Sequence, residues 1–375
     1  MKISTGFDSA NIECLDSSDP AHVRLAIRKD NQSDFYQWFH FRASGVKDTD
    51  CRFVIENAAG AAYPGGWENY RAVASYDREF WFRVPTRYAD GQLVIEHMPL
   101  HNSVYYAYFA PYSMERHADL VGAAQESPLA QLEVLGETLD GQDLDLLTVG
   151  EASADKLPFW LIARQHPGET MAEWWMEGFL GRLLDEDDAV CKALLQRVRF
   201  YVVPNMNPDG SRRGHLRTNA TGANLNREWQ NTTMETSPEV YLVRERMQQT
   251  GVALSLDVHG DETLPYNFIA GTQGIPDWTP ERDAELEFFR ATYQALNPDF
   301  QNAHGYPANP PGSANLGMCS NYIAHTFGCL AMTLEMPFKD TADTPDGLQG
   351  WSPERARRLG ASCIDVLWAH LRNRS

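Results

Sequence analysis

The first 110 or so residues carry short apolar and aromatic runs that are separated by turn signals. These runs are FYQWFHFR (from Phe35), CRFVIENA (from Cys51), REFWFRV (from Arg78), QLVIEHM (from Gln92) and VYYAYFA (from Val104). Glycine, proline, asparagine and aspartate lie between them, as in AAYPGGWENY and YADG. Short strands at this spacing, with no helical periodicity between them, predict a small antiparallel β-sandwich whose aromatic residues form its core.

The pattern changes from about Ser127, where strand-like apolar runs begin to alternate with segments of helical periodicity. This alternation predicts an α/β fold with a mixed or mainly parallel sheet flanked by helices. Four of its runs end in polar or turn residues: PFWLIAR, RVRFYVVPN, VALSLDVHG and CLAMTLEMP. We therefore expect two domains, a β-sandwich over residues 1–125 and an α/β domain over residues 126–375.

The segment RQHPGET joins one of these runs to MAEWWMEGFLGRLL, whose bulky apolar residues recur every three or four positions. This spacing predicts a buried supporting helix with Glu173 and Glu177 in solvent. Ligands of open α/β sheets bind beyond the carboxyl ends of the strands. Chemically active side chains lie at four such positions, and they are His166, Glu169, His259 and Glu335.

His166 and Glu169 can converge on one ion. His166 precedes a proline, which favours an extended backbone, and Glu169 falls close to the start of the helix. Two nitrogens and one carboxylate form a common ligand set of catalytic zinc, and His259 is the best second nitrogen. An H-x-x-E spacing also arises by chance, and His259 taken alone could be a buried structural histidine. The convergence of these residues at equivalent strand ends favours the metal site.

Glu335 ends an apolar strand, with Leu334 and Met336 on the opposite face. Burying a carboxylate there is costly unless it is paired or used. Beside an activated water it could act as a general base. The alternative role is to cap the following turn.

The segment NPDGSRRGHLRTNATGANLNREW gathers four arginines, Arg212, Arg213, Arg217 and Arg227, in a strongly acidic chain. A guanidinium binds a carboxylate through two parallel hydrogen bonds and can stabilise an oxyanion. A solvated loop is the simpler interpretation for Arg212 and Arg213, but it suits Asn226 and Arg227 less well.

Composition narrows the classes of partner. The net charge is −19, the opposite of what nucleic acid or an anionic membrane would require. The apolar runs fall far short of the roughly 18 residues of a membrane span, and the N-terminus has no signal-peptide core. Six cysteines without a C-x-x-C pair predict reduced thiols and a cytoplasmic location.

Five motifs in order, HPGE, NPDG, GANLNREW, DVHG and LEMPF, resemble those of the zinc metallocarboxypeptidases. The similarity is closer to the cytosolic carboxypeptidase branch, whose eukaryotic members remove glutamates from polyglutamylated proteins. The N-terminal region, including WFHFR and YFAPYS, also resembles the leading β-sandwich of that branch. The resemblance therefore covers nearly the whole chain.

The resemblance implies a zinc-dependent enzyme that hydrolyses the C-terminal peptide bond of peptides or proteins. It also suggests a preference for substrates with acidic C-terminal residues. One zinc ion would be held by His166, Glu169 and His259. Glu335 would be the general base and proton shuttle, and Arg217 would stabilise the oxyanion. Asn226 and Arg227 would hold the terminal carboxylate of the substrate.

The chain departs from the digestive members of the family at two places, and one further family position is not assigned. Gly168 stands where those members carry an arginine, and the cytosolic branch shares this glycine. The tyrosine that closes over substrate has no clear counterpart, because the register of Tyr322 before Glu335 does not match. The residue that selects the substrate side chain falls within 317–322 but is not assigned.

Two other functions fit parts of the sequence. Aspartoacylase-like and succinylglutamate desuccinylase-like amidohydrolases share the metal set and act on small N-acyl amino acids. The leading sandwich and the intact NPDG to LNREW segment favour the peptidase. In a non-catalytic module the sandwich would recruit a protein partner, but a retained Glu335 argues against that role. In an enzyme, the sandwich would either brace the catalytic domain or recruit a partner.

Overall fold

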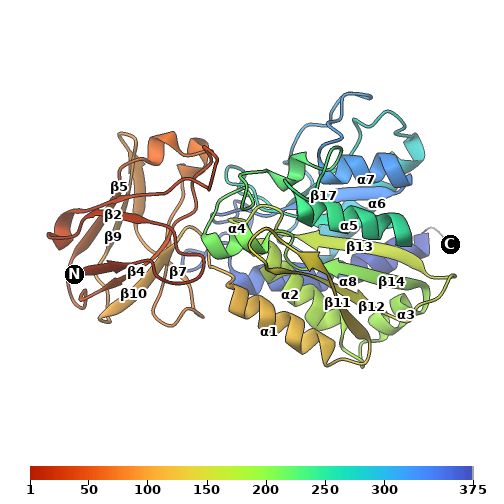
Figure 1. The fold of residues 1–375 in the computed structure, drawn as a ribbon, viewed down its shortest axis with the longest axis horizontal. Coiled ribbons are helices and arrows are strands. Elements are labelled where there is room, and N and C mark those ends of the chain that lie inside the picture. The colour runs from red at the N-terminus through yellow and green to blue at the C-terminus, as the bar shows by residue number, and fades with distance from the viewer. Residues whose placement is uncertain (374–375) are drawn as a thin grey trace.

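The computed structural model describes residues 1–373 and consists of two units that lie end to end (Figure 1). The first unit is a β-sandwich built from the N-terminal strands, and the second is an α/β unit with helices on both faces of its sheet. The two ends of the chain lie at opposite ends of the molecule.

The sandwich contains two five-stranded sheets. The strands of one sheet, in spatial order, are β1 (Lys2–Ser4), β4 (His40–Ser44), β10 (Ser103–Ala107), β6 (Val73–Ser75) and β7 (Phe82–Arg83). Those of the other are β2 (Glu13–Asp16), β3 (Val23–Ala26), β5 (Cys51–Ile55), β9 (Gln92–His97) and β8 (Thr86–Ala89). Short 3-10 helices lie at Pro20–His22, Ala58–Gly60 and Pro64–Trp67.

The predicted sandwich is confirmed, with one pair of strands in a different orientation. Every other strand pair of the two sheets is antiparallel, whereas β3 and β5 run parallel. The chain leaves this sheet after β3, forms β4 in the opposite sheet and then returns, and such a crossover delivers a parallel strand. Aromatic side chains fill the interior as expected, for example Phe53, which packs against both Phe41 and Tyr106.

The α/β unit has a seven-stranded mixed sheet. Its strands, in spatial order, are β11 (Ala130–Glu137), β12 (Asp143–Val149), β14 (Val198–Val203), β13 (Leu157–Ala163), β15 (Leu254–Val258), β17 (Leu330–Glu335) and β16 (Phe268–Ala270). The four central strands β14, β13, β15 and β17 are parallel, and the outer strands pair antiparallel. The carboxyl ends of the four apolar runs therefore meet at one edge, as predicted.

Helices cover both faces of this sheet. The core on one face includes side chains from α2 (Met171–Leu183), α3 (Ala189–Arg197), α6 (Pro280–Leu296) and α8 (Pro353–Asn373). The core on the other includes α5 (Pro238–Thr250) and α7 (Cys319–Phe327). Two further helices are α4 (Pro208–Arg213) and the 3-10 turn Leu225–Arg227. The helix α1 (Met114–Gln125) contacts β11 and β12, and the domain division at residue 125 stays a prediction.

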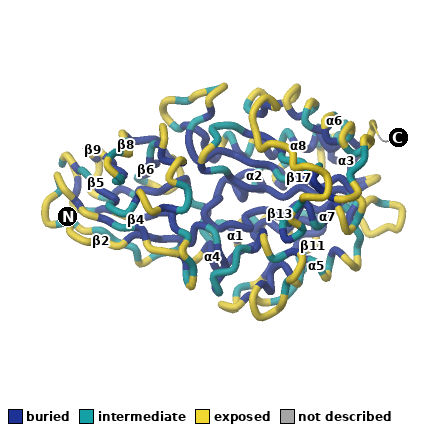
Figure 2. The backbone as a smooth tube through the Cα atoms, turned by 90° about the horizontal axis from the view of Figure 1, so that it is seen from above, coloured by how far each residue is buried: buried dark blue, intermediate teal, exposed yellow. Residues whose placement is uncertain are grey.

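The helix α2 is buried along almost its whole length, as Figure 2 shows, which confirms its predicted supporting role. The expectation that Glu173 and Glu177 are in solvent is wrong. Glu173 is completely buried, and Glu177 is half-buried and pairs with Arg116 and Arg357. Arginines from α1 and α8 converge on α2, which sequence periodicity does not reveal.

Within residues 1–373, none of the helices has the length and apolar character that a membrane crossing requires.

Candidate active site

The loop that follows β13 is held in one shape by a buried arginine. Arg164 has a positive φ of 58°, and its Nε donates a hydrogen bond to the Pro167 carbonyl at 2.9 Å. The Gly168 backbone N–H donates to the Leu216 carbonyl at 2.8 Å, and a Cβ at Gly168 would lie only 2.9 Å from that oxygen. A glycine at position 168 therefore lets the loop approach the neighbouring segment closely.

Three buried ligand atoms converge at the carboxyl ends of β13 and β15. Glu169 Oε1 lies 2.7 Å from His166 Nδ1, and Glu169 Oε2 lies 2.7 Å from His259 Nδ1. The two Nδ1 atoms are 3.2 Å apart. The three residues are no more than 3% exposed, and their ligand atoms lie within 4.8 Å of one another. Such a group can close around a single ion.

Further polar groups orient both imidazole rings. The Nε2 atom of His166 lies 3.0 Å from Asn224 Oδ1, and that of His259 lies 2.8 Å from Asp257 Oδ2. Histidine ligands commonly use their second nitrogen in this way, which fixes the tautomer and the ring orientation. With Nε2 engaged, Nδ1 of each ring is the atom that faces the shared point. Two nitrogens and a carboxylate in this arrangement fit a zinc ion with an open position.

The protonation states of His166 and Glu169 suit a cation, whereas the carboxylates of Asp257 and Glu169 outweigh burial and raise the pKa of His259 well above its usual value. Burial lowers the pKa of His166 to about 4, and the positive charge of Arg217 adds to this effect. Burial acts to raise the pKa of Glu169, but the neighbouring His166 and His259 outweigh it, so that the pKa lies well below its usual value. A neutral imidazole and an ionised carboxylate are the protonation states in which these side chains bind metals.

Glu335 ends β17 beside this group. It is 7% exposed, and among the described residues its Oε2 atom is buried without a hydrogen-bond partner. Burial raises its pKa well above the usual value, and the nearby carboxylates of Glu169, Asp261 and Glu262 add to the shift. A carboxyl group that binds its proton tightly beside a metal-type cluster is suited to proton transfer.

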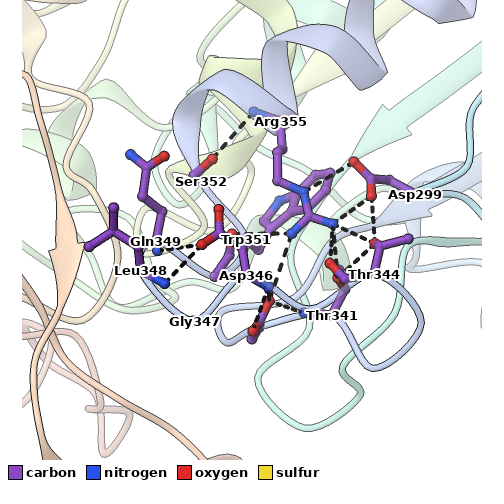
Figure 3. A network of polar contacts seen from close by, with 12 residues as sticks. Asp299, Thr341, Thr344, Asp346, Gly347, Leu348, Gln349, Trp351, Ser352 and Arg355 are labelled. Carbon is purple, nitrogen blue, oxygen red and sulfur yellow. Dashed lines mark hydrogen bonds and ion pairs between the residues drawn. The ribbon is translucent and has the colours of Figure 1, made fainter.

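The chain that follows Glu335 is anchored on two sides. On one side, Arg355 at the start of α8 donates to Asp299, Thr341 and Thr344 (Figure 3). On the other, Arg83 of the sandwich donates to the carbonyls of Phe338 and other residues. These contacts hold the end of β17 in place.

A cavity of about 160 Å³ opens next to Glu335. Most of its lining side chains are polar and uncharged, and they include Asn226, Thr272, Gln273, Ser320, Asn321 and Thr333. Arg290 of α6 also lines it, as does Met318. The predicted segment 317–322 thus contributes to this cavity. Tyr322 is not among its lining residues, and its ring packs against Trp229 and the Arg244 guanidinium.

The four arginines of the polar segment have separate surroundings. Arg212 and Arg213 are exposed, and Arg213 pairs with Asp140 at 2.7 Å, which agrees with the solvated-loop interpretation. The Arg217 guanidinium lies over the rings of Phe35 and Tyr63. Burial lowers the pKa of Arg227, and the charge of Arg217 contributes. Arg217 and Arg227 therefore lie close enough for their charges to interact.

The side chain of Asn226, in the 3-10 turn Leu225–Arg227, is held against the first residue of α7. Its Oδ1 atom accepts a hydrogen bond from the Cys319 backbone N–H at 2.8 Å. The residue is 6% exposed and also lines the cavity beside Glu335. The predicted carboxylate-binding residue therefore lies next to the predicted base.

Sequence reasoning missed three residues of this region. Tyr306 lines the cavity and donates a hydrogen bond to Asp261 at 2.5 Å. Tyr63 and Asp30 reach the segment around Arg217 from the sandwich. Tyr306 and Tyr63 lie in glycine- and proline-rich stretches whose local pattern predicts only turns, and no periodicity identifies them.

Two family models match the chain. Residues 3–109 match the cytosolic carboxypeptidase N-terminal domain, and residues 117–354 match the zinc carboxypeptidase family. The chain is a member of the zinc carboxypeptidase family. It is an enzyme, a metallocarboxypeptidase, and its cofactor is one zinc ion. The predicted family, fold class and cofactor are thereby confirmed.

Proteins similar over their whole length support this assignment. A metallo-carboxypeptidase from Burkholderia cenocepacia has 47% identity, full coverage of both chains and a TM-score of 0.97. One from Pseudomonas aeruginosa, solved with (2-guanidinoethylmercapto)succinic acid, has 46% identity, 99% coverage of both chains and a TM-score of 0.97. An uncharacterized protein of Zymomonas mobilis is 51% identical over 98% of this chain and 96% of its own length.

Proposed function

We propose that this zinc carboxypeptidase removes C-terminal residues at the edge of the sheet where His166, Glu169 and His259 converge. The observation that carries the proposal is the geometry of these three residues, whose ligand atoms are buried within 4.8 Å of one another. We assign them as the zinc ligands. The contacts of Asn224 and Asp257 with the two rings support this assignment, because they turn both Nδ1 atoms inward.

A bound zinc ion supplies electrophilic activation of the scissile carbonyl and of the attacking water. Glu335 takes the proton of that water and delivers it to the leaving amine. Its buried and unpartnered Oε2 atom supports this role, because no other described group competes for it.

We assign Arg217 to the developing oxyanion, and Asn226 and Arg227 to the terminal carboxylate of the substrate. Among the described residues, the buried Nε of Arg217 has no hydrogen-bond partner, which supports this assignment. A grip on the terminal carboxylate places the last peptide bond over the reacting groups. It also restricts cleavage to the end of a chain.

The decisive experiment replaces Glu335 with glutamine. Glu335→Gln is expected to lower kcat on C-terminal peptides by about 10²- to 10⁴-fold, the usual worth of a general acid–base group, with unchanged zinc content. The control is Glu245→Gln, an exposed glutamate on α5, which is expected to keep wild-type activity.

Zinc content and substrate range complete this test. His166→Ala is expected to lose stoichiometric zinc. Assays of C-terminal peptides beside small N-acyl amino acids distinguish the peptidase from an amidohydrolase. Turnover that persists in Glu335→Gln would contradict the assigned base, and cleavage of N-acyl amino acids alone would contradict the peptidase.

We also propose that the enzyme favours acidic C-terminal residues. Among the described residues, Arg290 is the one cationic side chain that lines the cavity beside Glu335. It donates to the Ile269 carbonyl and pairs with Glu287, whose side chain is 57% exposed. The side-chain carboxylate of an acidic C-terminal residue, if it entered the cavity, would meet a fixed guanidinium and neutral amides.

A matched pair of variants tests this preference. Arg290→Gln is expected to lower kcat/KM for peptides ending in glutamate about tenfold relative to peptides ending in leucine, because one charge-assisted hydrogen bond is lost. Arg282→Gln, on the same helix but paired with Asp277, is expected to leave the ratio unchanged. An unchanged ratio in Arg290→Gln would exclude this cavity as the source of an acidic preference.

The cysteines and the net charge support two further proposals, on the cellular location and on the class of partner. All six cysteines are free, and five of them are buried, which is in keeping with a reducing compartment such as the cytoplasm. The charge of −19 disfavours nucleic acid as a partner. The expected partner is the C-terminus of a peptide or protein.

A further inference from the structure

A buried carboxylate of the sandwich binds the backbone on both sides of Arg217. Asp30 lies in the loop between β3 and β4 and is 3% exposed. Its Oδ1 atom accepts from the Leu216 N–H at 2.7 Å, and its Oδ2 atom accepts from the N–H groups of Arg217 and Thr218 at 2.8 and 2.9 Å. The Thr218 hydroxyl also donates to Oδ2. Three consecutive backbone positions are thus tied to one side chain.

Two aromatic rings of the sandwich also contact the Arg217 side chain. Its guanidinium carbon lies 5.6 Å from the centre of the Phe35 ring and 5.4 Å from that of Tyr63. The buried side chain of Gln37 holds Tyr63 by accepting from its N–H at 2.8 Å and donating to its carbonyl at 3.0 Å. Aromatic faces attract a guanidinium and restrict its movement.

Two glycines allow the Arg217 segment to close against the sandwich. Gly214 and Gly222 have positive φ values of 73° and 82°. A Cβ at Gly214 would lie 2.6 Å from the Ser9 carbonyl oxygen, and a Cβ at Gly222 would lie 2.6 Å from that of Gln32. Both positions therefore need glycine for their conformation and for the close approach.

We propose that the sandwich completes the catalytic centre of this enzyme, with Asp30 as the positioning residue that presents Arg217 to the substrate. This inference rests on the role proposed above for Arg217. Among the described residues the buried Nε of Arg217 has no hydrogen-bond partner, so the place of the guanidinium is set by its backbone and by the two rings. An oxyanion donor is effective only when its position is fixed before the reaction.

Asp30→Asn tests the proposal with almost no change in volume. The asparagine amide replaces one acceptor oxygen by an NH₂ donor. This donor would face backbone N–H groups, which are donors themselves, so their hydrogen bonds are lost. We expect kcat to fall about 10- to 100-fold with KM changed less than about threefold, because an oxyanion donor acts in the transition state. Zinc content is expected to stay unchanged. Asp34→Asn, an exposed neighbour paired with Lys29, is the control and is expected to behave as wild type.

A double-mutant cycle separates positioning from general stability. If Asp30 acts through Arg217, Asp30→Asn lowers kcat less than about twofold further on an Arg217→Ala background. Equal losses on both backgrounds would overturn the proposal, as would wild-type kcat in Asp30→Asn. Should Asp30→Asn fail to fold, Phe35→Leu in the same cycle removes one aromatic face and is expected to give a smaller loss with the same dependence on Arg217.

Amide hydrogen exchange provides a measurement that does not need turnover. Asp30→Asn is expected to speed exchange in residues 216–218 more than about tenfold. If the wild type cleaves no C-terminal peptide bond but this exchange rises, the proposed function fails while the anchoring by Asp30 stands. Unchanged exchange in these residues overturns the positioning role itself.

Discussion

Glu173 and His117 form the centre of a buried charged group behind the active-site loop. His117 Nδ1 lies 2.8 Å from Glu173 Oε1, and its Nε2 lies 3.2 Å from Asp145 Oδ2. Arg164 donates to the other oxygen of Glu173, and Asn205 donates to the same oxygen at 3.1 Å. A charge is tolerated in the interior when it is paired and hydrogen-bonded in this way.

His117 makes the stability of the protein depend on pH. Burial acts to lower its pKa, but the carboxylates of Asp145 and Glu173 outweigh burial and raise the pKa to about 9. A folded pKa above the unfolded value of about 6.5 contributes stability that is complete below pH 6.5 and is lost as the pH rises to 9. We expect the contribution of His117 to the free energy of unfolding to fall by roughly 3 kcal/mol over this pH range.

Urea unfolding at pH 6 and pH 9 measures this effect. His117→Gln is expected to lose most of the difference between the two pH values that the wild type shows. His101→Gln, an exposed histidine of the sandwich, is expected to retain it. Equal pH dependence in wild type and His117→Gln would show that His117 is not the titrating group.

At the scale of elements, α2 and α8 cross at two glycines. A Cβ at Gly178 of α2 would lie 2.0 Å from the Arg357 carbonyl oxygen, and one at Gly360 of α8 would lie 2.0 Å from that of Trp175. Real Cβ atoms do not approach oxygen so closely, so the helices pack backbone to backbone there. This contact seats α2 under the loop that carries His166 and Glu169.

Gly178→Ala is expected to destabilise the protein by about 2 kcal/mol or more, because overpacking outweighs the gain of up to about 1 kcal/mol in helix propensity. Gly181→Ala on the same helix is the matched control, since a Cβ at Gly181 would meet nothing within 4 Å. That variant is expected to be neutral or slightly more stable. Denaturant unfolding of both variants measures the difference, and similar stabilities would contradict the close crossing.

At the scale of the whole molecule, Arg83 connects the two units. Its guanidinium is buried and donates to the carbonyls of Phe338, Trp351 and Gln349 across the interface and to that of Arg71 within the sandwich. Burial lowers its pKa to about 10. Together with Asp30, it attaches the sandwich to two segments of the catalytic unit.

Arg83→Met is expected to lower the free energy of unfolding by roughly 3 kcal/mol, because several buried carbonyls lose their donor. The control is Arg87→Met, an exposed position on β8, which is expected to change stability by less than about 0.5 kcal/mol. Thermal unfolding followed by circular dichroism and by tryptophan fluorescence tests both. Equal midpoints for the two variants would mean that Arg83 does not stabilise the interface.

Local sequence determined the strands, the helix after HPGE and the placement of His166, Glu169, His259 and Glu335 at strand ends. Apolar periodicity records which face of an element is buried, and the residue before a proline or within a glycine turn has few backbone choices. The type of each element and its buried face depend on residues that are neighbours in the chain, so a single sequence is sufficient to predict them. The order of the five motifs then indicated the family.

Tertiary structure alone decided the rest of the site. Asp30 reaches residues 216–218 across more than 180 positions of chain. Glu173 is enclosed by His117 of α1 and by Arg164 and Asn205, which follow β13 and β14. Tyr306 and Arg290 line the cavity from a loop and a helix that carry no motif. The arrangement of these side chains depends on how separate elements pack, and that packing follows from the whole core rather than from any local pattern.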